Sequence, residues 1–91
     1  MKPVFVRKPT EEQKALLLAQ PTWEHDPEKW EASYDEREET CLVIEGEAYV
    51  QTQDGIRYHF AAGDLVTFQP NMDCIWCVEK KIKKHYIFDM K

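Results

Sequence analysis

The chain has 91 residues, 43% of them hydrophobic, including three Trp, four Tyr and four Phe. This supplies one packed core but not two, which argues against disorder and against a second domain. The formal net charge of −5 argues against a nucleic-acid or anionic-membrane surface, because such surfaces need clustered positive charge.

The N-terminal segment carries signals for one strand and one helix. The run Val4–Val6 is apolar and is closed by Pro9, which is typical of an edge strand. Thr10 followed three residues later by Gln13 fits a capping box, so we expect a helix to begin there. Pro21 then ends it, because proline cannot continue the backbone hydrogen bonding of a helix.

From Trp23 onward the signals are those of short strands separated by turn residues. The strand candidates are Trp23–His25, Trp30–Asp35, Thr40–Ile44, Ala48–Thr52, Ile56–Phe60, Leu65–Phe68, Cys74–Val78 and Ile82–Phe88. Turns about every 8–12 residues predict a small all-β sandwich or barrel. We therefore expect a single domain over residues 1–91, with a strand-and-helix arm over 1–22 and a β-barrel over 23–91.

The lysine-rich stretch between Lys80 and Lys84 is the main basic feature of the chain. We interpret it as the solvated turn of a hairpin that also protects a sheet edge. No apolar run approaches the length of about 18 residues that a membrane span needs, and the start lacks a signal-peptide core. Three cysteines without framework spacing indicate a reducing environment. We expect a cytoplasmic protein, with an organelle still open if a transit peptide has been removed.

Alternation along a strand decides which side chains share a face. By this rule Glu39 shares a face with Cys41, and Cys74 shares one with Trp76. Cys74 and Cys77 are three residues apart, so they point to opposite faces. A redox or zinc C-x-x-C motif instead needs a helix N-terminus or a tight turn. The two cysteines therefore do not predict a dithiol site.

The stretch ETCLVIEG at residues 39–46, the hairpin GEAYVQTQDG and the segment AAGDLVTFQP resemble the two sequence boxes of the cupin family. More narrowly, the Trp-rich start, GDLVTF and KKHY resemble small cupins of the ureidoglycine aminohydrolase-like group. The resemblance covers about Trp23 to Tyr86 and implies a jelly-roll barrel with one short N-terminal helix. Because the core is small and Val4–Val6 offers an edge strand, we also expect a homodimer.

Cupins usually hold a metal ion with three histidines and one glutamate. Position by position, the resemblance places Ser33, Asp35, Glu39 and Cys74 where those ligands stand, and none of the three histidines of this chain falls there. Asp35, Glu39 and Cys74 could ligate zinc, whereas a lone thiolate suits manganese and iron poorly. We therefore favour no metal, and we keep these three residues as the candidate ligands of zinc, manganese or iron.

A glutamate with inward parity in an apolar strand is costly unless a partner or ligand satisfies it, so Glu39 predicts a pocket. Lys84 and His85 are adjacent on the last strand and face opposite ways, and the sequence leaves open which of them points inward. The candidate pocket residues are Ser33, Asp35, Glu39, Cys74, Trp76, Lys84 and His85.

Three functions fit these residues. We favour the binding of a small polar molecule without a catalytic metal. The second is a metal-dependent enzyme acting on a small nitrogenous or carbonyl compound, which the narrower resemblance implies. The third is a structural or interaction subunit with a filled barrel, in which Glu39 pairs with Lys84 or Tyr34 and Cys74 only fills space beside Trp76. Whether the protein is an enzyme is left open.

Overall fold

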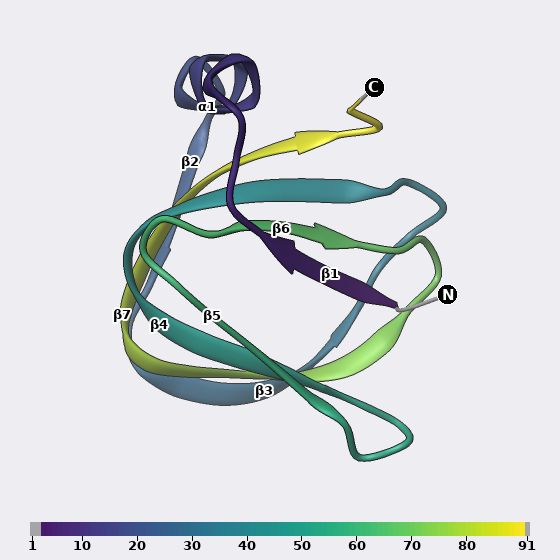
Figure 1. The fold of residues 1–91 in the computed structure, drawn as a ribbon. Coiled ribbons are helices and arrows are strands. Elements are labelled where there is room, and N and C mark those ends of the chain that lie inside the picture. The colour runs from purple at the N-terminus through teal and green to yellow at the C-terminus, as the bar shows by residue number, and fades with distance from the viewer. Residues whose placement is uncertain (1–2, 91) are drawn as a thin grey trace.

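The computed structural model describes residues 3–90. Its elements in chain order are β1 (Val4–Arg7), α1 (Glu11–Leu18), β2 (Thr22–His25), β3 (Glu28–Ser33), β4 (Glu39–Thr52), β5 (Arg57–Ala61), β6 (Leu65–Phe68) and β7 (Asp73–Phe88). The predicted all-β architecture with one short helix is confirmed. Figure 1 shows the strands curving round a common interior, with α1 near the C-terminal end of β7.

All strand pairs are antiparallel, and two long strands organise them. The order across the sheet is β1-β6-β4-β7-β2, with β3 also pairing with β7 and β5 with β4. β4 pairs with β6 through Glu39–Leu42 and with β5 through Glu47–Gln51. β7 likewise pairs with β3 through Asp73–Val78 and with β2 through Ile82–His85. Because each long strand has different neighbours at its two ends, the sheet bends round its own interior.

The sequence-based prediction divided each of the two long strands, β4 and β7, into two shorter strands, and this division is wrong. β7 runs without interruption through Lys80 and Lys81, so the predicted hairpin there is wrong. In β4 the register shifts between Val43 and Ala48. Gly46 in this stretch has φ +88°, and a Cβ on it would lie 2.1 Å from the carbonyl oxygen of Lys81. The glycine that suggested a turn therefore forms a β-bulge, because both features need a residue that tolerates positive φ.

The bulge changes which β4 side chains face the interior. Before it, Cys41 and Val43 belong to the main core cluster, and after it Ala48 and Val50 do. Inward positions thus pass from odd to even residue numbers along one strand. Trp76 on the neighbouring strand β7 belongs to the same cluster. This agrees with the alternation pattern, which predicted that Trp76 and Cys74 share one face.

The helix packs on the outside of the sheet over a second, smaller core. Leu17 is the buried residue of α1, and it packs with Leu42 of β4 and Leu65 of β6. The predicted capping box is confirmed. The Thr10 hydroxyl accepts a hydrogen bond from the backbone N–H of Gln13 at 3.1 Å, and the Gln13 side chain accepts one from the backbone N–H of Thr10 at 2.9 Å.

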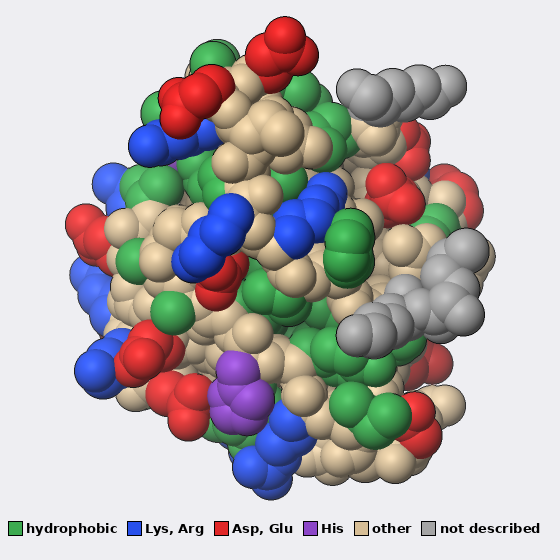
Figure 2. Space-filling view, viewed as in Figure 1, with side chains coloured by type: hydrophobic (Ala, Val, Ile, Leu, Met, Phe, Trp, Pro, Cys, Tyr) green, Lys and Arg blue, Asp and Glu red, His purple; other side chains and the backbone are tan. Residues whose placement is uncertain are grey.

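The surface carries charges of both signs. Figure 2 shows acidic and basic side chains interspersed over the visible face, without one large patch of either sign. Within residues 3–90 there is no helix with the length and apolar character that a membrane crossing requires.

Candidate functional site

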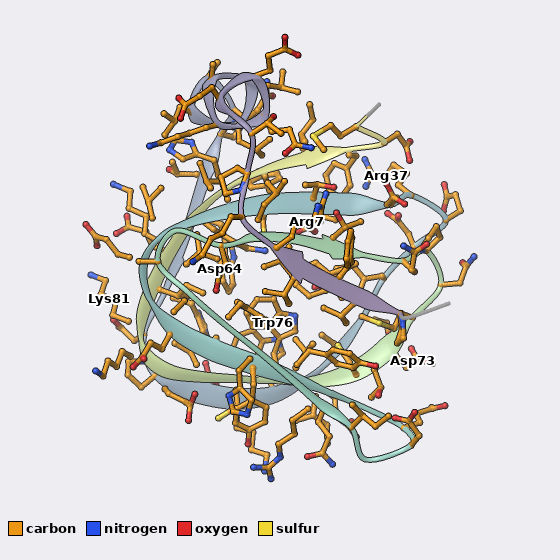
Figure 3. The ribbon with its side chains drawn as sticks, viewed as in Figure 1. Arg7, Arg37, Asp64, Asp73, Trp76 and Lys81 are labelled. Atoms are coloured by element: carbon orange, nitrogen blue, oxygen red, sulfur yellow. The ribbon has the colours of Figure 1, made fainter. Side chains whose placement is uncertain are left out.

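A cavity of about 250 Å³ lies between β2, β3, the start of β4 and β7. Its lining residues are Trp23, Trp30, Ala32, Tyr34, Glu39, Trp76, Lys84, Tyr86 and Phe88. Six of these nine side chains are aromatic, so the walls are apolar and stiff. Three predicted site residues, Glu39, Trp76 and Lys84, meet here. Figure 3 shows Trp76 pointing into the interior that the strands enclose.

The aromatic walls hold one another in place. The rings of Trp30 and Trp76 are stacked, with their centroids 5.7 Å apart and an angle of 10° between their planes. Trp23 meets Trp76 edge to face at 5.8 Å. The indole Nε1–H of Trp76 donates a hydrogen bond to the hydroxyl oxygen of Tyr34 at 2.9 Å. These contacts fix the shape of the cavity before any ligand arrives.

A buried ion pair supplies the charge in the cavity. Lys84 Nζ donates to Glu39 Oε2 at 2.8 Å, and the two side chains are only 7% and 13% exposed. Val43 lies opposite Lys84 in the β4–β7 register, so the lysine side chain runs along the inward face to reach Glu39 four residues earlier. Lys84 Nζ also lies 5.0 Å from the ring centroids of both Trp23 and Trp76. The aromatic faces thus add cation–π stabilisation to the ammonium.

Burial and charge set the protonation of the groups around this pair. Burial by itself lowers the pKa of Lys84, but its interactions with neighbouring groups, among them the charge and the hydrogen bond of Glu39, leave it above its ordinary value. Burial raises the pKa of Cys41 to about 11, with Lys84 opposing the shift. Burial also raises the pKa of Tyr34 well above its usual value, and the Glu39 carboxylate reinforces that. At neutral pH these groups are therefore an ammonium, a thiol and a phenol.

Ser33 and Cys74 line a different cavity, of about 390 Å³, which β3 forms with the end of β4 and the start of β7 and which shares Ala32 with the first cavity. The Ser33 hydroxyl donates to Asp73 Oδ1 at 2.6 Å. Cys74 belongs to the main core cluster, and burial raises the pKa of its thiol to about 11. Cys74 is therefore a packed, protonated thiol. We place the candidate site in the first cavity because that cavity holds the buried charges.

Asp35 and His85 lie outside both cavities. Asp35 is an exposed residue between β3 and β4, and its carboxylate binds Arg37 Nη2 at 2.8 Å. Hydrogen bonding to the Arg37 side chain lowers the pKa of Asp35. His85 places Nδ1 2.8 Å from the backbone carbonyl oxygen of Gln20. The question that the sequence left open is thus answered: Lys84 points into the barrel and His85 points away from it.

The residues at the cupin metal-ligand positions do not converge on one point. Ser33 and Cys74 line the second cavity, Glu39 lines the first, and Asp35 is at the surface. The Glu39 carboxylate already binds the ammonium of Lys84. Within the described residues 3–90, no three His, Cys, Asp or Glu side chains lie close enough to hold a metal ion together. This donor set does not fit a cupin-type metal centre.

Most of the aromatic wall was missed from the sequence, although the alternation pattern carried the signal. Trp30, Ala32 and Tyr34 are spaced two apart and continue one inward face along and just beyond β3. Tyr86 and Phe88 do the same at the end of β7. Extending parity from the inward residues to the strand ends would have found these residues.

The comparisons with known proteins agree with this architecture. A sequence model of the EutQ-like cupin domain matches residues 13–86. A DUF861 family protein from Thermotoga maritima is 38% identical with a TM-score of 0.85, over 93% of this chain and 98% of that one. The EutQ protein of Clostridium difficile is 16% identical with a TM-score of 0.66, over 74% of this chain and 52% of that one.

A putative ethanolamine utilization protein Q from Salmonella typhimurium LT2 is 17% identical with a TM-score of 0.66, over 93% of this chain and 68% of that one. No curated protein matches the chain. The predicted cupin fold is confirmed by these likenesses, whereas the narrower resemblance to the ureidoglycine aminohydrolase-like group is not.

Proposed function

The chain belongs to the family of EutQ-like cupin domains, and from this premise we propose that it binds a small molecule in the aromatic cavity without using a metal ion. The observation that carries the proposal is the buried Glu39–Lys84 ion pair. Replacing such a pair with apolar residues is often neutral or stabilising, so folding alone does not explain it. Binding a ligand through both charges would explain why the chain buries this ion pair.

The size of the cavity limits the ligand. At about 250 Å³, it lies below the range of about 300–1,000 Å³ that is usual for drug-sized ligands. The six aromatic side chains favour a compact molecule with an apolar body, and the ion pair favours a polar edge. We therefore propose a small metabolite with one polar edge.

The relatives support the fold more than the ligand. The two EutQ structures share the fold at 16% and 17% identity, so their names do not transfer a substrate. A metal-dependent enzyme of the ureidoglycine aminohydrolase-like type would need ligands that converge, and Asp35, Glu39 and Cys74 are apart. Protein purified with added zinc, manganese and iron is expected to carry no stoichiometric metal. Stoichiometric metal would contradict this part of the proposal.

Filling the cavity tests the proposal directly. The experiment is a thermal-shift screen of small metabolites on the wild type, on Ala32→Leu and on Ala15→Leu. Ala32 lines this cavity and also the second one, so the added side chain should abolish any ligand-induced rise in Tm. Ser33 lines only the second cavity, so Ser33→Leu is added as a further variant and should keep the rise when the ligand lies in the aromatic cavity. Ala15 is exposed on α1, so its variant should respond like the wild type. A ligand that still stabilises Ala32→Leu does not bind in this cavity, and a screen without any stabilising compound would count against binding.

A further inference from the structure

The charges and hydrogen-bonding groups of the cavity also define a ligand class. We propose that the cavity selects a neutral, flat molecule that presents an N–H donor next to a C=O acceptor, as the edge of a lactam or cyclic amide does. This inference rests on the proposed binding function and adds the chemistry of the ligand to it.

The charge balance of the cavity favours a neutral ligand. Glu39 and Lys84 are its charged lining residues, and they cancel each other at 2.8 Å. The other lining side chains are aromatic or Ala32. An anion or cation entering this space would lose its water and leave the cavity with a net charge. A neutral molecule avoids both costs.

The ion pair leaves one acceptor and several donors for a ligand. Glu39 Oε2 binds Lys84, while Oε1 has no hydrogen-bond partner among residues 3–90. Lys84 carries three N–H donors and uses one of them on Glu39. The Tyr34 oxygen accepts from Trp76 Nε1, and its own proton has no acceptor in the described part of the chain. A ligand N–H can thus donate to Glu39 Oε1, and a ligand C=O can accept from Lys84 or Tyr34.

The walls favour a flat ligand. Trp30 and Trp76 are nearly parallel, at 10° and with centroids 5.7 Å apart, and Trp23 stands across Trp76 at 64°. Such rings offer stacking and edge contacts to a planar π system. Flatness, neutrality and a paired donor and acceptor together describe a cyclic amide rather than an amine, an acid or an alkyl chain.

Three matched probes separate these properties by calorimetry on the wild-type protein: 2-quinolinone, N-methyl-2-quinolinone and 2-naphthoate. 2-Quinolinone is expected to bind roughly ten-fold or more tightly than either of the others. The N-methyl compound cannot donate to Glu39, and hydrogen bonds to charged groups contribute that much. The anion 2-naphthoate adds a buried charge. Equal binding of the three, or tightest binding of 2-naphthoate, overturns the ligand class but leaves the proposed binding function standing.

If none of the three probes binds while the metabolite screen gives a cavity-dependent Tm shift, the ligand class is wrong and the binding function holds. If both experiments show no binding, both proposals fail. The two inferences are therefore separable.

Charge variants provide a second test. Glu39→Gln leaves the Lys84 charge without its counter-ion, so 2-naphthoate should gain roughly ten-fold relative to 2-quinolinone. The double variant Glu39→Gln/Lys84→Met is neutral again and should prefer the neutral probe, which keeps the test usable if the single variant does not fold. Glu47→Gln is the control, because Glu47 pairs with Lys80 at the exposed surface. An unchanged probe ratio in Glu39→Gln would overturn the charge argument.

Discussion

Replacing Lys84 with Met would test the buried ion pair most directly. Met keeps most of the length and apolar surface of the lysine stem but removes Nζ. The Glu39 carboxylate, only 13% exposed, is then left in an aromatic cavity without its cation. The two tryptophan rings that lie 5.0 Å from Nζ also lose their cation–π partner.

The expected loss of stability in Lys84→Met follows from two opposing free energies, the attraction between the two charges and the cost of burying each ion. Two unit charges 2.8 Å apart attract each other by roughly 6 kcal/mol at an effective dielectric constant of about 20. Burying each ion costs several kcal/mol, so the intact pair contributes little net stability. Removing one partner cancels the attraction but leaves the cost of the other ion. We therefore expect Lys84→Met to lower the free energy of unfolding by about 3–5 kcal/mol.

That loss is large against a total of roughly 5–14 kcal/mol for a chain of this length. The assay is urea unfolding at pH 7, followed by tryptophan fluorescence, for the wild type, Lys84→Met, Glu39→Gln and the double variant. The double variant is expected within about 1 kcal/mol of the wild type, because it removes both buried charges. A thermal scan of Lys84→Met should show a Tm lowered by at least about 10 °C.

Two results would refute the reasoning. A loss of less than about 1 kcal/mol in Lys84→Met would mean that water screens the pair as at an exposed surface. A double variant whose loss equals the sum of the two single losses would mean that the charges do not interact. Lys80→Met is the matched control, because Lys80 pairs with Glu47 at 3.0 Å with both side chains exposed. It should leave stability almost unchanged.

Three further predictions concern other features of the molecule. Burial raises the pKa of Cys41 from an ordinary value of 9.0 to about 11 in the folded chain. The stability that its buried thiol contributes is therefore complete below about pH 9 and is lost as the pH rises towards 11. Urea unfolding across this range should show roughly 2–3 kcal/mol of pH dependence that Cys41→Ala lacks, and an unchanged pH dependence in that variant would contradict burial as its cause. Gly46→Ala should lower unfolding free energy by at least about 2 kcal/mol, because both φ and space forbid a Cβ there. Gly55→Ala, with φ +85° but open space, should cost less, and equal losses would refute the steric argument. We also propose the homodimer through β1, where Phe5 is 51% exposed; Phe5→Lys should sediment as a monomer, and a wild type that is already monomeric would refute it.

The parts of the fold that local chemistry determines could be predicted from the sequence. The capping box at Thr10 depends only on residues within one turn, and it is present. Strand alternation placed Trp76 on the inner face. The bulge at Gly46 could not be distinguished from a turn, because the difference lies in whether the chain continues beside Lys81, far away in sequence. A local pattern cannot contain that long-range partner.

The residues of the candidate site also divide into those that local sequence could predict and those that it could not. Glu39 was found because its parity in an apolar strand demanded a partner, and the structure supplies Lys84. Whether Lys84 or His85 points inward follows from alternation counted along β7 from Trp76. The predicted hairpin at Lys80 and Lys81 broke that count, so the sequence could not decide between them. Asp35 follows the inward Tyr34 just beyond the end of β3, so the same alternation points it outward, and Arg37 holds it at the surface.

The bulge in β4 also constrains how the cavity can vary between related chains. Side chains at Cys41 and Val50 face the same interior only because the extra residue between them offsets the two halves of the strand. Deleting one residue there would turn every inward side chain of one half towards solvent. The lining can therefore diverge by substitution, whereas length changes have to fall in turns such as the one at Gly55, which lies outside the packed interior.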